Sequence, residues 1–195
     1  MKLKESKTFL NLAKSFAGEC QAMTRYRFLE YGLRKEGYKC LAEIVDNVAY
    51  NEFTHARMFY TKIQSADNAV TDNIDICSGY PFKQKWDITE NLRLAAEDET
   101  NETERIYAEY EATAREEGFG DVAELYKNIR QVENCHRLLF EDLYNQMKRG
   151  TLYSKSVKQK WKCSACGYEE ENKEAFAVCP LCGEKQGSVM LKLND

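Results

Sequence analysis

Two short motifs contain both histidines of the chain, and each pairs a histidine with a glutamate. They are NEFTH, with Glu52 and His55, and VENCH, with Glu133 and His136. A separation of three residues is close to one helical turn, so each glutamate and histidine share a helix face and can meet one metal ion. A single pair of this kind is more typical of a solvated helix surface. Two pairs that use every histidine of the chain indicate a metal site.

The two motifs lie at equivalent positions of an internal repeat. The segment from Arg34, RKEGYKCLAEIVDNVAYNEFTHA, matches the segment from Arg115, REEGFGDVAELYKNIRQVENCHR, at a shift of 81 positions. Both histidines and both glutamates of the motifs obey this shift. The repeat predicts a duplicated helix pair, arranged about a pseudo-twofold axis.

Further carboxylates complete a ligand set. Glu19 lies in the mostly small and apolar stretch FAGECQAMTRY, and Glu99 follows 80 positions later. One glutamate from each of two helices, with Glu-x-x-His from each of two others, is the pattern of carboxylate-bridged di-iron and di-manganese bundles. Glu102 is one turn beyond Glu99, and its counterpart is Ala22. It is interpreted as a seventh ligand that makes the two metal positions unequal, or else as part of an acidic helix face.

Long helices must position these side chains. Periodicity and caps predict helices over residues 6–35 and 38–65, a third that begins near Asp87 in the capping box DITE, and a fourth that begins at Asp121 in DVAE and ends near Arg149. Residues 66–86 lack periodicity and are interpreted as a long crossover. The predicted fold class is mainly α, with a four-helix bundle over residues 1–149, a linker over 150–157 and a small metal-binding β domain over 158–195.

The C-terminal segment contains a second metal motif. KWKCSACGYEEENKEAFAVCPLCGEK has two C-x2-C pairs separated by twelve residues. Four thiolates in a tetrahedron bind zinc or iron, and the spacing alone does not distinguish a structural zinc site from a redox iron site. The predicted ligands are Cys163, Cys166, Cys179 and Cys182. The remaining cysteines are interpreted as small buried or free thiols: Cys20, Cys40, Cys77 and Cys135.

Charge and hydropathy narrow the possible partners. The net charge of −4 favours neither nucleic acid nor a membrane surface. The N-terminus has no apolar signal-peptide core, and no window is apolar enough to cross a bilayer. We therefore expect a cytoplasmic protein, in which cysteines are ligands or free thiols and not disulfides.

Seven segments of the chain resemble the rubrerythrin family, and together they extend over nearly its whole length. In chain order they are FAGECQAMTRY, NEFTHA, ENLRLAAEDETNE, REEGF, VENCHR, WKCSACGY and CPLCG. The resemblance implies a ferritin-like bundle with an oxo- and carboxylate-bridged di-iron site, and a rubredoxin-like tail with one iron, or zinc as prepared. It further implies a peroxidase of the NADH peroxidase type, which reduces hydrogen peroxide to water in oxidative stress defence. Electrons would pass through the tail iron from rubredoxin or an NAD(P)H-dependent reductase.

The resemblance also implies roles for individual residues. Glu52 and Glu133 would bridge the irons, with Glu19 and Glu99 as terminal ligands, and His136 would stay on the second iron. The tail of one subunit would approach the di-iron site of the other in a homodimer.

The catalytic residues that the resemblance implies form two further pairs. His55 and Glu102 would be alternative ligands of the first iron, which moves between them as its oxidation state changes. Tyr26 and Tyr107 match family tyrosines that hydrogen-bond ligand carboxylates, although plain core packing is an alternative for both.

Two alternative functions fit parts of the pattern. A ferritin-like ferroxidase would use the bundle to oxidise and pass on ferrous iron, but it needs no fused tetracysteine iron. A scaffold with a structural zinc ribbon would use the tail, but it needs no set of seven inward ligands.

Overall fold

Two long helices form the first half of the bundle. After a 3-10 turn at Leu3–Glu5, α1 spans Lys7–Lys35 and α2 spans Lys39–Ser65. The hydroxyl oxygen of Ser6 accepts the N–H of Phe9 at 3.1 Å and caps α1. The chain reverses at Gly37, whose φ of +89° lies in the left-handed region that favours glycine. These bounds confirm the helices predicted over residues 6–35 and 38–65.

The second half contains an interrupted helix followed by a long one. It comprises α3 (Ile88–Asn101), a π-helical turn (Glu102–Ile106), α4 (Tyr107–Glu116) and α5 (Gly120–Arg149). The carboxylate of Asp87 accepts the N–H of Glu90 at 2.7 Å, which confirms the predicted helix start. The π-helical turn was not predicted.

The prediction that Asp121 caps the last helix is wrong. α5 begins one residue earlier, after Phe119, whose carbonyl accepts the N–H groups of Val122 and Ala123 at 3.1 and 3.0 Å. The Asp121 side chain instead forms an ion pair with Lys62 on α2. A long-range partner therefore replaces the local capping bond.

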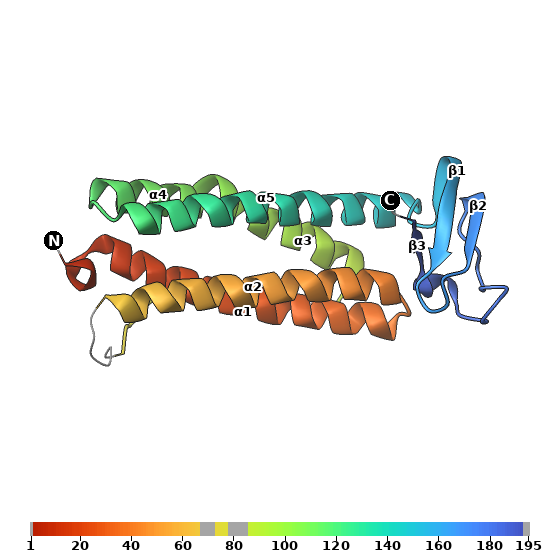
Figure 1. The fold of residues 1–195 in the computed structure, drawn as a ribbon, viewed down its shortest axis with the longest axis horizontal. Helices are drawn as coiled ribbons and strands as arrows, with labels where there is room; N and C mark the ends of the chain where they lie inside the picture. Colours follow the sequence, from red (N-terminus) through yellow and green to blue (C-terminus); the bar gives the residue numbers. More distant parts are fainter. Residues whose placement is uncertain (1, 67–72, 78–85, 193–195) are drawn as a thin grey trace.

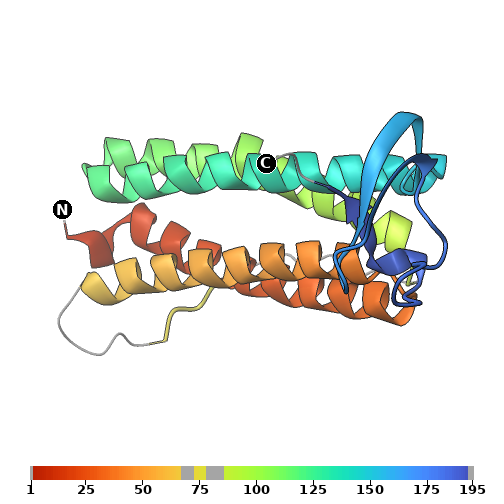
Figure 2. The same ribbon diagram turned by 45° about the vertical axis from the view of Figure 1, so that its right-hand side comes forward.

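The computed structural model describes residues 2–66, 73–77 and 86–192. α2 ends at one end of the bundle, and α3 begins at the other (Figures 1 and 2). The crossover predicted for residues 66–86 lies largely outside the described residues. None of the helices in the described ranges has the length and apolar character needed to cross a membrane.

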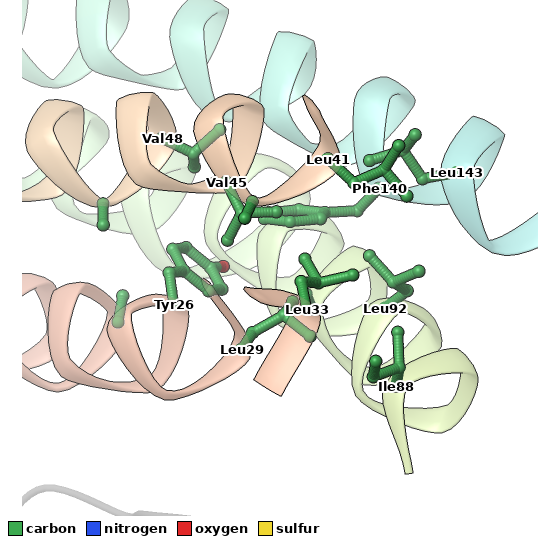
Figure 3. Close-up of a cluster of buried hydrophobic side chains, with 14 residues drawn as sticks. Tyr26, Leu29, Leu33, Leu41, Val45, Val48, Ile88, Leu92, Phe140 and Leu143 are labelled. Atoms are coloured by element: carbon green, nitrogen blue, oxygen red, sulfur yellow. The ribbon is translucent and has the colours of Figure 1, made fainter. Parts of the chain in front are cut away.

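The apolar core forms two clusters along the bundle. One cluster lies near the α1–α2 turn, where Tyr26, Val45, Leu92 and Phe140 from four helices pack together (Figure 3). The other lies toward the opposite end and includes Leu12 and aromatic residues of α2, α4 and α5. Along α1 and α2 the ligand positions predicted from the sequence fall between these clusters, so apolar packing closes the bundle on both sides of them.

A small antiparallel sheet follows the bundle. Its strands are β1 (Ser154–Cys163), β2 (Glu169–Glu174) and β3 (Val189–Leu191), in the order β2-β1-β3, with a 3-10 turn at Gln186–Ser188. Trp161 is buried beside Ala175 and donates its indole N–H to a β2 carbonyl. β1 begins within the range 150–157, so the domain boundaries there remain a prediction.

The sheet domain contacts the bundle at the α1–α2 turn (Figure 1). Lys39 forms an ion pair of 2.6 Å with Glu184. A Cβ atom on Gly187 would lie 1.6 Å from the carbonyl oxygen of Gly37, so two backbones meet where only glycine fits. The tail therefore packs at a specific contact site on the bundle of the same chain.

Candidate metal centre

Six ionisable side chains from α1, α2, α3 and α5 converge in the middle of the bundle, and all are buried. They form two overlapping groups, in each of which the possible ligand atoms lie within 4.8 Å of one another. One group contains Glu19, Glu52, His55 and Glu133, and the other contains Glu52, Glu99, Glu133 and His136. Glu52 and Glu133 belong to both groups, which is the arrangement expected of carboxylates that bridge two metal ions.

Each imidazole points its Nδ1 atom at the carboxylates. His55 Nδ1 lies 2.9 Å from a Glu133 oxygen and 3.1 Å from a Glu52 oxygen. His136 Nδ1 lies 2.8 Å from Glu133 and 2.9 Å from Glu52. One Nδ1 proton can serve only one of these oxygens well, whereas a cation can satisfy all of them.

The carboxylate oxygens provide a test of whether metal ions fit. One oxygen on each of Glu19, Glu52, Glu99 and Glu133 is buried without a hydrogen-bond partner among the described residues. For Glu52 and Glu133 the nearby imidazole nitrogen lies within ion-pair distance but is not aligned for a hydrogen bond. Buried acceptors without donors are costly, and two divalent cations would satisfy these four oxygens. The donor set therefore fits a two-metal site.

The protonation pattern follows from the same crowding. Burial, followed by repulsion from neighbouring carboxylates, raises the pKa of Glu19 and Glu99 well above the ordinary value. Burial would also raise the pKa of Glu52, but close contacts with the imidazoles of His136 and His55 outweigh it and lower that pKa to about 2. Burial would lower the pKa of His136, yet contacts with Glu133 and Glu52 raise it to about 9. The buried carboxylates therefore require compensating positive charge, which two bound metal ions would supply.

Two tyrosines cross from one half of the bundle to the other. Tyr107 donates its hydroxyl hydrogen to Glu19 at 2.5 Å, and Tyr26 donates to Glu99. Each tyrosine therefore leaves the second oxygen of its carboxylate available for a metal. Both hydroxyl groups are buried, which raises the pKa of each tyrosine well above its ordinary value and keeps it a donor.

The π-helical turn changes the register between the two halves. Glu19 and Glu99 are 80 positions apart, whereas Tyr26 and Tyr107 are 81 apart. One extra residue therefore lies between Glu99 and Tyr107, and the π turn at Glu102–Ile106 accommodates it. This change of spacing was visible in the sequence and could have predicted the turn.

Glu102 lies at the start of this turn and outside both four-residue groups. It is half-buried, and burial together with the charges of Glu133 and Glu52 raises its pKa well above the ordinary value. Its carboxyl group is thus close enough to interact with both shared glutamates. The structure brings six of the seven predicted bundle ligands together and places the seventh beside them.

Arg130 supports the π turn and was not predicted to matter. Its Nε donates to the carbonyl of Thr103 at 2.9 Å, and a guanidinium nitrogen donates to Glu111 at 2.8 Å. The position 81 residues earlier is Ala49, which lies in the half without a π turn. Because Arg130 occurs in only one half, the search for repeated residues could not reveal it.

A cavity of about 450 Å³ reaches the turn from the molecular surface. Glu102 and Tyr107 line it, together with Lys14, Arg25 and Arg105. Arg25 is fixed there by an ion pair of 3.0 Å with Asp98. The cavity gives a small polar molecule a path to the side of the carboxylate cluster where Glu102 lies.

The four predicted tail cysteines also converge. Their sulfur atoms lie within 4.8 Å of one another, with Cys163 and Cys182 3.7 Å apart and Cys166 and Cys179 3.6 Å apart. Burial would raise the pKa of the Cys179 thiol, but hydrogen bonds from the backbone N–H groups of Cys182 and Leu181 outweigh burial and lower this pKa to about 7. A thiolate set of this kind fits one tetrahedral iron or zinc ion.

The other four cysteines are free thiols, as the sequence indicated. Cys40 is buried and Cys20 half-buried, whereas Cys77 and Cys135 are exposed. Asn51 is a further residue that sequence reasoning missed, since its side-chain oxygen lies 3.3 Å from Nε2 of His136. It directly precedes Glu52 in the first motif, but nothing about an isolated asparagine marks it as a partner of a distant histidine.

Comparison with known proteins agrees with both halves of this description. The rubrerythrin family model matches residues 11–144, and the model of the rubrerythrin, rubredoxin-like domain matches residues 161–188. A rubrerythrin of Clostridium perfringens is 38% identical over 180 residues, which cover 92% of this chain and 91% of that protein. A rubrerythrin of Porphyromonas gingivalis is 32% identical and covers 94% and 89% of the two chains.

Solved structures show the same fold. Nigerythrin in a mixed-valence state superposes with a TM-score of 0.63 at 22% identity, over 96% of this chain and 90% of that one. A bacterioferritin of Desulfovibrio desulfuricans gives a TM-score of 0.62 at 22% identity, over 74% and 82%. The fold is therefore a ferritin-like bundle with a rubredoxin-like tail, and its two ligand clusters correspond to a di-iron site and a single iron site. On these matches and this geometry, the chain belongs to the rubrerythrin family.

Proposed function

We propose that this protein is a peroxidase of oxidative stress defence, which reduces hydrogen peroxide to water with electrons that pass through the tetracysteine iron. The two irons of the bundle would supply the electron pair that breaks the O–O bond, and two protons would complete two water molecules. The observation that carries the proposal is the shared position of Glu52 and Glu133 in two ligand groups, beside a cavity that contains Glu102.

The ligand roles follow the two groups. Glu52 and Glu133 would bridge the metals, while Glu19 and Glu99 would each bind one metal through the oxygen that its tyrosine leaves free. Glu19 on α1 and Glu52 on α2 lie between the two apolar clusters, so apolar packing on both sides holds their positions.

The asymmetric residues would handle the substrate. Hydrogen peroxide would enter through the cavity beside Glu102 and Tyr107. Glu102 lines this cavity, so its carboxyl group would be placed to exchange a proton with the entering peroxide. His55 and Glu102 would exchange as ligands of the same metal, so that binding of Glu102 accompanies release of His55.

Electrons would come from the tail of a second subunit. Within one chain, the tail contacts α2 through Cys40, whose thiol lies 3.5 Å from the Ser164 hydroxyl. Cys40 and Glu52 are twelve residues apart on this helix, which is about 18 Å along its axis at 1.5 Å per residue. A homodimer in which each tail approaches the partner's bundle would avoid this long path. The donor to the tail would be a rubredoxin or an NAD(P)H-dependent reductase.

Rapid mixing tests the proposal. Anaerobically reduced, iron-loaded protein is mixed with hydrogen peroxide or with air-saturated buffer, and the visible absorption of the ferric tetrathiolate is followed. We expect peroxide to oxidise the protein at least about tenfold faster than air, a difference of about 1.4 kcal/mol in the barrier. Glu52→Ala should abolish this difference, and Glu43→Ala, which changes an exposed glutamate of the repeat, is the matched control that should retain it.

Each contrary outcome has a defined meaning. Equal rates with peroxide and air, together with turnover of added ferrous iron, would favour the ferroxidase alternative. A protein that binds no iron in the bundle and only zinc in the tail would act as a scaffold, and the peroxidase proposal would be abandoned.

A further inference from the structure

The two histidines differ on the side that faces away from the carboxylates. Nε2 of His136 lies 3.3 Å from the side-chain oxygen of Asn51, while Nδ1 of the same ring faces Glu133 and Glu52. An imidazole that binds a cation through Nδ1 carries its proton on Nε2, so Asn51 accepts that N–H. The bond fixes both the tautomer and the orientation of the ring.

The internal repeat shows what His55 lacks. A shift of 81 positions relates His136 to His55, and relates Val132 to Asn51. Valine has no polar side-chain atom, and among the described residues we find no other acceptor for Nε2 of His55. The Nδ1 contacts of the two rings are nevertheless similar, at 2.9 Å from Glu133 for His55 and 2.8 Å for His136. The two rings thus have similar contacts at Nδ1, whereas only His136 has a polar partner at Nε2 among the described residues.

We infer that Asn51 is a positioning residue that fixes the His136 ring for metal binding, and that His55 lacks this support because Val132 occupies the matching position. The inference rests on the proposed exchange between His55 and Glu102 and explains why only one histidine takes part in it. The His136 ring can shift only if the Asn51 bond breaks, whereas among the described residues the His55 ring has no such bond on its Nε2 side.

Selective labelling can observe both rings separately. The chain has only two histidines, so 15N-histidine labelling of the full-length, zinc-loaded protein gives just two imidazole spin systems. We expect one Nε2–H to exchange with water at least about tenfold more slowly than the other, because a hydrogen-bonded proton is protected. Asn51→Ala should abolish the difference, and Asn51→Asp, which keeps an acceptor oxygen at the same distance along the side chain, should retain it.

The equivalent position in the other half supplies the reciprocal test. Val132→Asn should slow exchange at the His55 ring, and Val132→Ala is the matched control that should leave it unchanged. Equilibrium zinc titration gives a second readout. Asn51→Ala should weaken one of the two bundle sites by about 10- to 100-fold, the usual effect of removing an outer partner of a ligating histidine.

The outcomes separate this inference from the proposed function. If zinc fills the bundle but both N–H groups exchange alike in the wild type, or if Asn51→Ala changes neither exchange nor affinity, Asn51 is not a positioning residue. If the wild-type bundle binds neither zinc nor ferrous iron, the two-metal proposal fails, and this inference fails with it.

Discussion

The two halves of the bundle use the same inner ligands in different surroundings. The α1–α2 half and the α3–α5 half each supply one Glu-x-x-His pair, one further buried glutamate and one tyrosine. Only the second half contains the π turn with Glu102, and only it contains Arg130, where the first half has Ala49. The comparison teaches that duplication supplies the metal ligands, whereas unpaired residues around them distinguish one metal position from the other.

The turn between α1 and α2 and the turn between α4 and α5 also differ in their surroundings. Gly37 and Gly118 are equivalent, and both have positive φ, at +89° and +84°. The carbonyl oxygen of Gly37 faces Gly187 of the tail, whereas the turn between α4 and α5 lies at the end of the bundle away from the tail (Figure 1). Only the first half therefore carries the second metal domain.

The largest effect should follow from removing a carboxylate that belongs to both halves. Glu52→Ala should lower the bound metal from about three ions per chain to about one, because the tetracysteine site remains while both bundle positions lose a ligand. Glu19→Ala touches one group only and should retain more metal. Elemental analysis with Glu43→Ala as control measures this, and equal loss in the Glu52 and Glu19 variants would contradict the shared arrangement.

A smaller effect should follow from disturbing the turn that seats the tail. In Gly187→Ala the new Cβ meets the Gly37 carbonyl, and backbone overlap of this kind costs about 1–3 kcal/mol. We expect the tetracysteine iron to stay bound while urea unfolding shifts to lower concentration. Gly120→Ala is the control, since a Cβ there meets nothing within 4 Å. Identical midpoints for the two variants would show that this contact site contributes no stability.

The π turn should respond to loss of its supporting guanidinium. Arg130→Ala leaves the Thr103 carbonyl without this donor and should cost about 1–2 kcal/mol. Metal content should stay normal while reoxidation by peroxide slows, because Glu102 is displaced. Arg137→Ala, which breaks an exposed ion pair with Glu141, is the matched variant. A normal peroxide rate in Arg130→Ala would separate the turn from the chemistry.

The smallest effect should come from a contact between the halves at the end opposite the tail. The Glu117 carboxylate accepts the N–H groups of Lys7 and Thr8 and the Thr8 hydroxyl. Slight burial would raise the pKa of Glu117, but these hydrogen bonds outweigh burial and lower the pKa below its usual 4.5. A lowered pKa in the folded state means that the contribution is present above pH 4.5 and is lost as pH falls below it.

The test is a pair of variants across pH. Glu117→Gln should cost about 0.5 kcal/mol at neutral pH, a value reduced by solvent exposure, and the difference from wild type should shrink in acid. Glu36→Gln, at the equivalent position of the first half, is the control. A difference for Glu117→Gln that grows in acid would have the wrong sign.

Much of the bundle could be predicted because its signals are local and repeated. Ser6 and Asp87 mark helix starts through capping bonds a few residues away, and two equivalent Glu-x-x-His pairs locate the site. The start of α5 was predicted one residue late because Asp121 has a distant partner, Lys62. Glu102 was predicted as a ligand from its helix face, but the π turn alters that face.

The rest depends on contacts that a local pattern does not contain. Asn51 and Arg130 act on residues 85 and 27 positions away, and neither is repeated. β2 has the sequence EEENKE, without the alternation that usually indicates a strand, because one face of the small sheet has little core to cover. The cysteine spacing predicted the cluster but not the pairing order of the strands around it.

The change in spacing from 80 to 81 positions has a genetic consequence. Starting from two equal halves, the insertion of a single codon between those for Glu99 and Tyr107 reproduces the observed offset. Point substitutions alone cannot produce it. Deleting one codon within the turn is accordingly the shortest mutational route back to a symmetric ancestor-like bundle, with every inner ligand still encoded.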